Sequence, residues 1–236
     1  MSSLIIKPKL FCNVFKFPIS LFENSNEPLT YIGKKIIKGN DLEHCWNSFK
    51  KDFSDFDKIK TLTDLYQLKS GPLDKFSADT VFHPWIHRRP NKQHNDICLS
   101  IFKNKKRFII SYNKMLNLIS SIKSNGYDPT LTDDRQGGIV GYFLSSGHKV
   151  QFYVNAGNHR AATIKCLGIK SVPCLFQDYS NLKQRDIKET YLYDPNNTYF
   201  IRDYNTNFAA SWPAVESGFI DKETAIIIAN RYVHGY

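Results

Sequence analysis

One short stretch of the chain combines residue types that bind phosphate. In "FYVNAGNHRAATIKCLG", residues 152–168, an alternating strand pattern changes to an Ala-rich helical pattern at Gly157. A helix N-terminus offers backbone N–H donors and the positive end of the helix dipole, and a glycine before it lets an anion approach the backbone. In the first turn, an Arg guanidinium can bind phosphate oxygens in a fork and a His imidazole can add one donor. We therefore predict an anion-binding site formed by Gly157, Asn158, His159 and Arg160. The alternative is an ordinary strand–turn–helix corner with a solvated His-Arg pair.

The neighbouring elements follow from hydrophobic spacing. Residues 111–126 form the clearest helix, with Ser111 as its N-cap, Gly126 as its C-terminal stop, and an apolar face made of Met115, Leu116, Leu118, Ile119 and Ile122. "IVGYFL", the turn "SSGH" and "KVQFYVN" indicate a β-hairpin, because apolar and polar residues alternate in its second strand. A helix at 158–167 then ends at Gly168, and "IKSVPCLFQ" is the next strand.

The rest of the chain gives a coarser pattern. Residues 4–37 are predicted to form short β segments broken by prolines, residues 40–68 to be helical, and residues 69–98 to have little regular structure because they are rich in Pro, Gly and turn residues. Near the end, Asp221 can cap a helix in "KETAIIIANRY". No fixed-period repeat is present, so we predict one domain over residues 1–236.

Composition sets broad limits on function. The 236 residues are 42% hydrophobic and 23% charged, which is typical of a soluble globular protein. The net charge of +10 favours polyanionic partners, against the alternative of a solvated basic surface with no specific partner. Five cysteines without paired spacing argue against a secreted disulfide framework. Lysines interrupt the apolar N-terminal segment before it reaches membrane-spanning length. We therefore expect a cytoplasmic protein with no membrane span.

Four segments together carry a resemblance to a known superfamily. "LISSIKSNGYDP", the hairpin, "AGNHRAATIKCLG" and "KSVPC" resemble, in order and spacing, the core of the ParB/sulfiredoxin superfamily. The resemblance covers about residues 111–177 and implies an α+β fold, with elaborations at 1–110 and 178–236. Its members include DNA-partitioning proteins that bind CTP, sulfiredoxins that use ATP, and free-serine kinases. By this resemblance, residues 157–160 hold nucleotide phosphates.

Departures from the superfamily pattern separate its members. Sulfiredoxins carry their reactive cysteine where this chain has Asn158, which cannot form a thiolate, so sulfiredoxin chemistry is disfavoured. The serine kinases carry an acidic residue where this chain has Ala156, so a catalytic carboxylate must come from elsewhere. Candidates are Asp133, Asp134, Asp178 and Glu43, although each is also an ordinary surface or turn residue.

The C-terminal part disfavours the DNA-partitioning members. They need a helix-turn-helix module after the nucleotide domain, and residues 178–236 show no pair of periodic helices spaced for groove binding. The phrase "SWPAVESGFID" is similar to the tail of members found with glycosyltransferase and surface-polysaccharide genes. This resemblance implies a role in polysaccharide biosynthesis, with a sugar or saccharide precursor as acceptor.

A second histidine-rich segment offers two further interpretations. His83, His87, His94 and Cys98 have a spacing reminiscent of zinc ligands, but Pro84 and Pro90 prevent a regular helix there, and we predict no metal site. Instead, His87, Arg88 and Arg89 are candidates for binding an acidic sugar or phosphate of the substrate, against the alternative of a solvated basic loop. Cys166 and Cys174 are expected to be inert packing residues.

These observations lead to one principal functional hypothesis. The chain is predicted to be an ATP-dependent small-molecule kinase that uses ATP, or another nucleoside triphosphate or diphosphate, with Mg²⁺. His159 and a carboxylate from Asp133, Asp134 or Asp178 would carry the catalysis. The alternative is a non-catalytic module that binds a phosphorylated metabolite or, less favoured, nucleic acid. Nuclease activity ranks last because no carboxylate cluster suited to two metals stands out.

Overall fold

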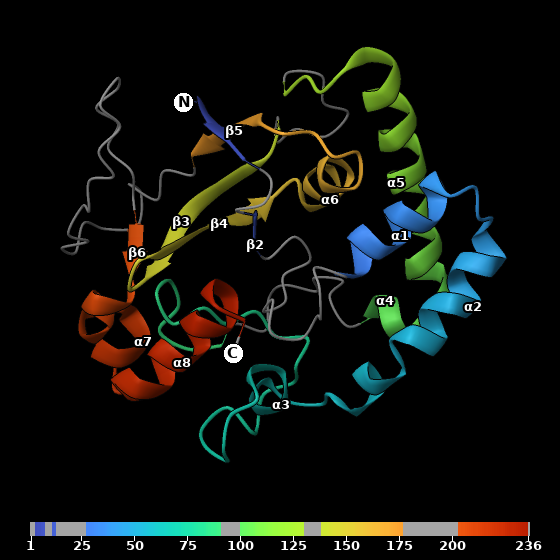
Figure 1. Cartoon of the computed structure of the whole chain (residues 1–236). Coiled ribbons are helices and arrows are strands. Elements are labelled where there is room, and N and C mark those ends of the chain that lie inside the picture. Colours follow the sequence, from blue (N-terminus) through green and yellow to red (C-terminus); the bar gives the residue numbers. More distant parts are fainter. Residues whose placement is uncertain are drawn as a thin grey trace.

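A mixed β-sheet lies at the centre of the computed structural model, which describes residues 3–7, 11–12, 27–90, 100–129, 138–176 and 203–235 (Figure 1). In these residues the sheet has six strands in the order β1-β5-β3-β4-β2, with β6 also paired to β3. The strands are β1 (Ser3–Ile6), β2 (Phe11–Cys12), β3 (Val140–Ser146), β4 (Lys149–Ala156), β5 (Val172–Phe176) and β6 (Asp203–Asn205). Helices together with this mixed sheet confirm the predicted α+β class.

The hairpin β3–β4 organises the sheet. Ser146 pairs with Lys149 across a two-residue turn, and Gly147 supplies the positive φ of 60° that such a turn needs. β4 occupies one edge of β3 along its length. The other edge of β3 pairs with β5 at its start and with β6 at its end, both in parallel. The predicted hairpin and the predicted strand after it are therefore confirmed.

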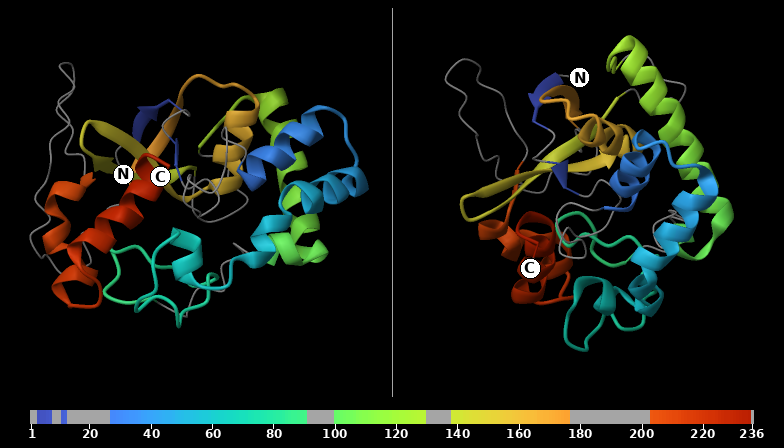
Figure 2. Two further views of the ribbon diagram at one scale, coloured as in Figure 1. Left: turned by 60° about the horizontal axis from the view of Figure 1, so that its bottom comes forward. Right: turned by 45° about the vertical axis from the view of Figure 1, so that its right-hand side comes forward.

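One group of helices packs on the side of the hairpin where α6 lies. It comprises α1 (Pro28–Ile37), α2 (Leu42–Asp52), α4 (Ser100–Lys103), α5 (Lys105–Asn125) and α6 (Asn158–Cys166) (Figures 1 and 2). Helices α1, α5 and α6 contact one another. Their close approach depends on Gly33 of α1, because a Cβ there would lie 2.6 Å from the Cys166 Sγ and 2.7 Å from the Met115 Cε.

Helix α1 corrects the prediction of short β segments over residues 4–37. Isoleucine, threonine and tyrosine favour strands, and they fill this segment. However, Leu29, Ile32 and Ile36 lie at helical spacing and are buried, and Pro28 occupies the first turn, where proline is tolerated. Packing against α5 and α6 therefore outweighs the local propensity. Only β1 and β2 of this range are strands among the described residues.

Helix α5 is longer than the predicted helix at 111–126. It begins six residues earlier, and its N-cap is Asn104, whose side chain accepts a hydrogen bond from the Lys106 N–H at 2.9 Å. The prediction that Ser111 is the N-cap was wrong, because Ser111 lies inside the helix and is buried. The predicted apolar face is also shifted, since Leu116 is 39% exposed. Gly126, with φ 76°, ends the helix as predicted.

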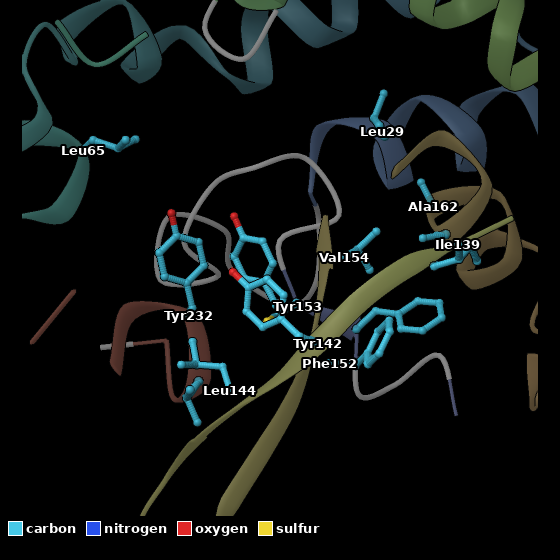
Figure 3. Packing of buried hydrophobic residues seen from close by; sticks show 14 of the residues in the cluster. Leu29, Leu65, Ile139, Tyr142, Leu144, Phe152, Tyr153, Val154, Ala162 and Tyr232 are labelled. Atoms are coloured by element: carbon cyan, nitrogen blue, oxygen red, sulfur yellow. The ribbon is translucent and has the colours of Figure 1, made fainter. Parts of the chain in front are cut away.

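A second group of elements covers the other side of the hairpin. It comprises α3 (Leu62–Tyr66), a 3₁₀ turn at Thr206–Ser211, α7 (Pro213–Glu216) and α8 (Lys222–Val233). The core here is aromatic: Tyr142 stacks on Tyr153 with ring centroids 4.7 Å apart, and the Tyr232 ring lies 5.6 Å from that of Tyr153 (Figure 3). The buried Tyr153 hydroxyl lies 2.6 Å from the His83 Nε2. Helix α8 therefore attaches the C-terminal elements to the sheet.

The remaining element predictions are mostly confirmed. The range 40–68 contains α2, a 3₁₀ helix (Ser54–Lys58) and α3, while 69–90 lacks long regular structure. Helix α6 ends at Cys166, next to Leu167 and Gly168, close to the predicted end. The short helix α7 had not been predicted. No helix in the described ranges is long and apolar enough to cross a membrane.

Asp221 caps α8 as predicted, and its carboxylate provides a testable contribution to stability. It accepts a hydrogen bond from the Thr224 N–H at 2.6 Å, and this backbone bond lowers the pKa of Asp221 below its usual value. The charged form thus stabilises the folded state above the unfolded pKa, and this contribution is lost as the pH falls through the lower folded pKa.

We expect Asp221→Ala to lower the free energy of unfolding by about 1 kcal/mol at neutral pH. Asp221→Asn, which retains an acceptor, is the matched control. It should keep most of the stability at pH 7 and show a smaller loss between neutral and acidic pH than the wild type. Urea unfolding followed by circular dichroism at several pH values measures both effects. Equal unfolding midpoints for the alanine variant and the wild type at pH 7 would contradict the capping role.

Candidate functional site

The start of α6 lies directly after the end of β4 and is shaped by Gly157. This residue is the N-cap and has φ 82° and ψ 25°, a left-handed conformation that glycine adopts without strain. A Cβ at this position would lie 2.7 Å from the Gly138 carbonyl oxygen and 3.0 Å from the Ile139 Cα. Glycine is therefore required both by the backbone conformation and by the contact between this corner and the start of β3.

The first turn of α6 presents the predicted residues together. The first hydrogen bond of the helix runs from the Ala161 N–H to the Gly157 carbonyl at 2.9 Å. The N–H groups of residues 158–160 therefore lie before the first i→i−4 hydrogen bond of the helix. Asn158, His159 and Arg160 are each partly exposed. Ala161, directly behind them, is fully buried, so the helix packs closely at this point. The structure thus gathers all four predicted residues at one partly accessible helix start.

His159 points from this start toward α5. The His159 Nε2 lies 3.3 Å from the Oγ of Ser111, a residue that is only 2% exposed. The His159 carbonyl accepts a hydrogen bond from the Thr163 hydroxyl at 2.9 Å. Sequence reasoning missed Ser111 as a site residue because it was assigned as a helix cap. The available signal was its spacing: Ser111 is a polar residue within the buried stripe that also contains Phe108, Met115 and Ile119.

Tyr127 lies on another side of the same corner. Its hydroxyl accepts a hydrogen bond from the Ile139 N–H at 3.1 Å, and burial raises the pKa of Tyr127 to about 12. The positive charge of Arg160 opposes this rise, whereas Asp128 adds to it. The phenol of Tyr127 therefore remains protonated at neutral pH. Neither Tyr127 nor Asp128 had been recognised from the sequence.

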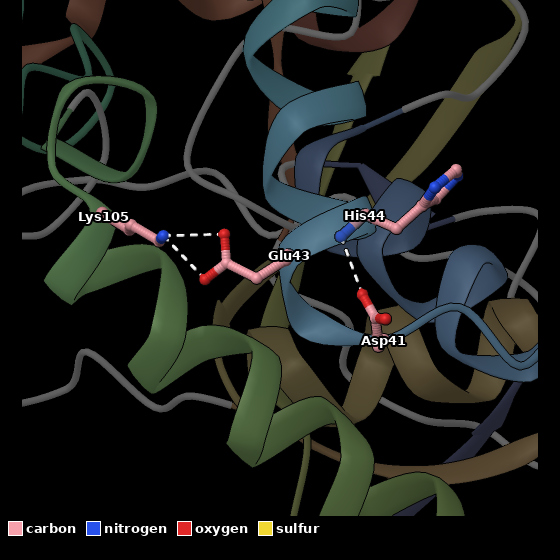
Figure 4. Close-up of polar contacts among 4 residues, drawn as sticks. All are labelled: Asp41, Glu43, His44 and Lys105. Carbon is pink, nitrogen blue, oxygen red and sulfur yellow. Dashed lines mark hydrogen bonds and ion pairs between the residues drawn. The ribbon is translucent and has the colours of Figure 1, made fainter.

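The predicted catalytic carboxylates are not tested by the structure. Asp133, Asp134 and Asp178 lie outside the described residues. Glu43, the fourth candidate, lies in α2, and its carboxylate forms an ion pair with Lys105 of α5 at 2.7 Å (Figure 4). That pair is close to the beginning of α5, and Glu43 is therefore engaged on the α2 side of this helix. Asp128, which follows Tyr127 in the chain, is a described carboxylate whose negative charge acts on the Tyr127 phenol.

The candidate substrate-binding residues lie beside α7 and not beside α6. The Arg88 carbonyl accepts a hydrogen bond from the Ser217 hydroxyl at 3.3 Å, and the Arg89 guanidinium lies 6.0 Å from the centre of the Phe219 ring. The His87 Nδ1 accepts a hydrogen bond from the His83 N–H at 3.0 Å. The structure thus places Arg88 and Arg89 beside residues 217 and 219, which follow α7, and His87 beside His83.

The possible metal ligands can be placed only in part. His83 is buried, with its imidazole beside the Tyr153 hydroxyl, and its ring stacks on that of His87. His94 and Cys98 lie outside the described residues. Within the ranges that the structure covers, no three His, Cys, Asp or Glu side chains are grouped to hold a metal ion.

The cysteines of the core have the predicted packing role. The Cys166 thiol donates a hydrogen bond to the Thr30 carbonyl at 3.2 Å, and burial raises its pKa to about 11. Burial likewise raises the pKa of Cys174 to about 12. Both thiols are therefore protonated at neutral pH, as packing cysteines are.

The arrangement at the α6 start can bind an anion. The backbone N–H groups of the first turn carry the positive end of the helix dipole, His159 and Arg160 belong to that turn, and the Tyr127 hydroxyl bonds the neighbouring Ile139 N–H. Comparison of the chain with protein-family models, with curated proteins and with solved structures found no match. Function must therefore be inferred from this corner and from the sequence resemblance.

Proposed function

We propose that the protein binds the phosphates of a nucleotide at the start of α6 and transfers a phosphoryl group to a small hydroxyl-bearing acceptor. The observation that carries this proposal is the grouping of Gly157, Asn158, His159 and Arg160 at one partly exposed helix start. The proposal also draws on the ParB/sulfiredoxin-like order of a helix, a hairpin, a Gly-x-His-Arg helix start and a Val-Pro strand. A sugar or saccharide precursor is the acceptor that the resemblance favours.

Each residue of the corner has a distinct part in this proposal. The N–H groups at 158–160 and the Arg160 guanidinium would hold phosphate oxygens and stabilise the charge that spreads over them in the transition state. His159, held beside Ser111 at 3.3 Å, would add one directed donor. A carboxylate would orient the acceptor hydroxyl, with Asp128, Asp133, Asp134 and Asp178 as candidates. Mg²⁺, when bound, would neutralise phosphate charge.

A non-catalytic phosphate-binding module is the second candidate function. It is favoured by two substitutions at the corner, Ala156 and Asn158, which replace the acidic residue and the cysteine that related enzymes use. The Asn158 amide donates to the Val154 carbonyl at 3.4 Å, so it serves the corner's own backbone. Such a module would bind phosphate without turning over the nucleotide.

The two candidates are separated by measuring binding and transfer on the same full-length protein. Calorimetry with ATP and Mg²⁺ measures affinity, and labelled ATP with a panel of sugars measures transfer. We expect Arg160→Ala to weaken ATP binding about tenfold or more, because a charge-assisted hydrogen bond is lost. Lys170→Ala is the matched control: it removes one exposed positive charge beyond the other end of α6 and should change affinity less than twofold.

The measured binding and transfer distinguish the kinase from the binding module. Transfer by the wild type, lost in the Arg160 variant, supports the kinase. Binding that depends on Arg160 without transfer to any acceptor supports the binding module. Absence of nucleotide binding by the wild type, or equal weakening by both variants, would refute a phosphate site at the α6 start.

A further inference from the structure

The segment 82–88 connects the hairpin to the C-terminal elements. The Trp85 indole N–H donates a hydrogen bond to the Tyr142 hydroxyl of β3 at 2.9 Å, and both side chains are almost completely buried. The Pro84 carbonyl accepts a hydrogen bond from the Ala214 N–H of α7 at 3.2 Å. The conformation of this segment therefore determines how α7 is held beside the sheet.

Two histidines close a turn within this segment. The His83 carbonyl accepts hydrogen bonds from the Ile86 and His87 N–H groups at 2.9 and 2.8 Å. In return, the His83 N–H donates to the His87 Nδ1 at 3.0 Å. The two imidazole rings also stack, with centroids 5.5 Å apart. The His87 side chain thus folds back onto the residue at which its own turn begins.

The bond from the His83 N–H requires an unprotonated nitrogen on His87. A ring nitrogen that accepts a hydrogen bond carries no proton, so the neutral His87 ring has its proton on Nε2. An added proton would lie on Nδ1, directed at the His83 N–H, and the attraction would become a repulsion. His87 is partly exposed, so its ring can exchange protons with solvent. Imidazoles are the side chains that commonly change charge near neutral pH.

Three phenols face the two histidines from the packed elements. The Tyr153 hydroxyl of β4 lies 2.6 Å from the His83 Nε2, and the Tyr232 ring of α8 lies 5.9 Å from the His83 ring (Figure 3). The Tyr66 hydroxyl of α3 donates a hydrogen bond to the Phe82 carbonyl. Burial raises the pKa of Tyr153 well above its usual value. Because phenols are neutral where imidazoles titrate, these hydroxyls supply no negative charge to an imidazolium.

Positive charge follows His87 directly in the chain. Arg88 and Arg89 are both exposed. The Arg88 carbonyl accepts a hydrogen bond from the Ser217 hydroxyl, and the Arg89 guanidinium lies 6.0 Å from the centre of the Phe219 ring. Like charges disfavour one another, so the two arginines oppose a further positive charge on His87.

We propose that His87 is a pH-sensitive switch that closes the turn at 83–87 when neutral and opens it when protonated, which loosens α7 and the residues after it from the hairpin. The open form binds the proton more readily than the closed form, so the closed turn is favoured at neutral pH and is lost as the pH falls. This inference does not depend on the phosphate site proposed at the start of α6.

Hydrogen–deuterium exchange of the full-length protein at about pH 7.5 and about pH 5.5, corrected for the intrinsic exchange rates, tests the switch. In the wild type, protection of residues 82–88 and 212–217 should fall about tenfold at the lower pH, because a buried donor loses its acceptor. Protection of α5 should change less than about twofold. In His87→Asn, the amide oxygen can accept the same hydrogen bond but does not titrate, so protection should persist at both pH values.

His44→Asn is the matched control, because it removes an exposed histidine from α2 and should behave as the wild type does. If His87→Asn loses protection as the wild type does, another group senses the acid. If α5 loses protection together with 82–88, acid unfolds the whole chain. Unchanged protection in the wild type would show that the turn does not open. If His87→Asn does not fold, the wild-type His87 ring can be titrated by NMR, and a midpoint different from that of the protection loss would overturn the proposal.

Discussion

Replacing Gly141 with alanine is expected to lower the free energy of unfolding by about 3 kcal/mol or more, the upper range for overpacking a buried site. A Cβ at this position in β3 would lie 2.1 Å from the Tyr153 carbonyl oxygen and 2.7 Å from the Phe152 ring. Neither neighbour can yield, because the carbonyl belongs to the partner strand and the Phe152 ring is fully buried (Figure 3). The strands would have to separate at the register shift beside Gly141.

Gly71→Ala is the control for this prediction. Gly71 is exposed, and the nearest atom to an added Cβ is a backbone oxygen at 4.0 Å. Urea unfolding followed by tryptophan fluorescence should show a midpoint close to that of the wild type for Gly71→Ala and a much lower midpoint for Gly141→Ala. A Gly141→Ala protein as stable as the control would show that the hairpin is less tightly packed at this position.

The second large effect is expected for Lys165→Met, which should lower the free energy of unfolding by about 3–5 kcal/mol. The Lys165 ammonium of α6 lies 2.7 Å from the Glu27 carboxylate, which precedes α1, and the two side chains are only 14% and 5% exposed. The variant leaves the Glu27 charge buried with the Thr30 hydroxyl, at 3.1 Å, as its hydrogen-bond partner. This pair is thus a buried ionic link between the start of α1 and α6.

Two comparisons isolate the effect of burial. The double variant Glu27→Gln with Lys165→Met removes both charges and should recover most of the lost stability. Lys58→Met breaks an ion pair of the same 2.7 Å length with Asp55, but both side chains are more than 80% exposed, so the loss should be far smaller than that of Lys165→Met. Thermal unfolding measures the stability of the double variant, of Lys58→Met and of Lys165→Met. Similar losses for Lys58→Met and Lys165→Met would contradict the dominant role of burial.

Elements with strong local signals could be predicted from the sequence. The hairpin was indicated by alternation around a Ser-Gly turn, α6 by the change of period at Gly157, and α8 by its Asp221 cap. Each of these signals acts within a few residues. The prediction for the α1 segment was wrong because its β-branched residues favour a strand. Contacts with α5 and α6, which lie far along the chain, make this segment a helix.

The candidate site was predictable where it is local in sequence. Residues 157–160 are consecutive, so one motif identified them. Ser111 and Tyr127 reach the same corner from α5 and its C-terminal side, and no spacing rule links them to His159 or Arg160. Residues 87–89 were predicted to bind substrate because they are basic, but they lie beside α7 and not beside the α6 start. Composition identifies basic groups, whereas only tertiary packing decides which of them meet.

The strand order imposes a sequence of events on folding. β1 and β2 occupy the first twelve residues, yet β1 pairs with β5 and β2 pairs with β4, both beyond residue 148. On the ribosome, the N-terminal strands emerge long before their partners exist and cannot enter the sheet until most of the chain has been synthesised. The β3–β4 hairpin, closed by a two-residue turn, can form locally, whereas β2 must find β4 and β1 must find β5 across most of the chain. Such high contact order is associated with slow folding.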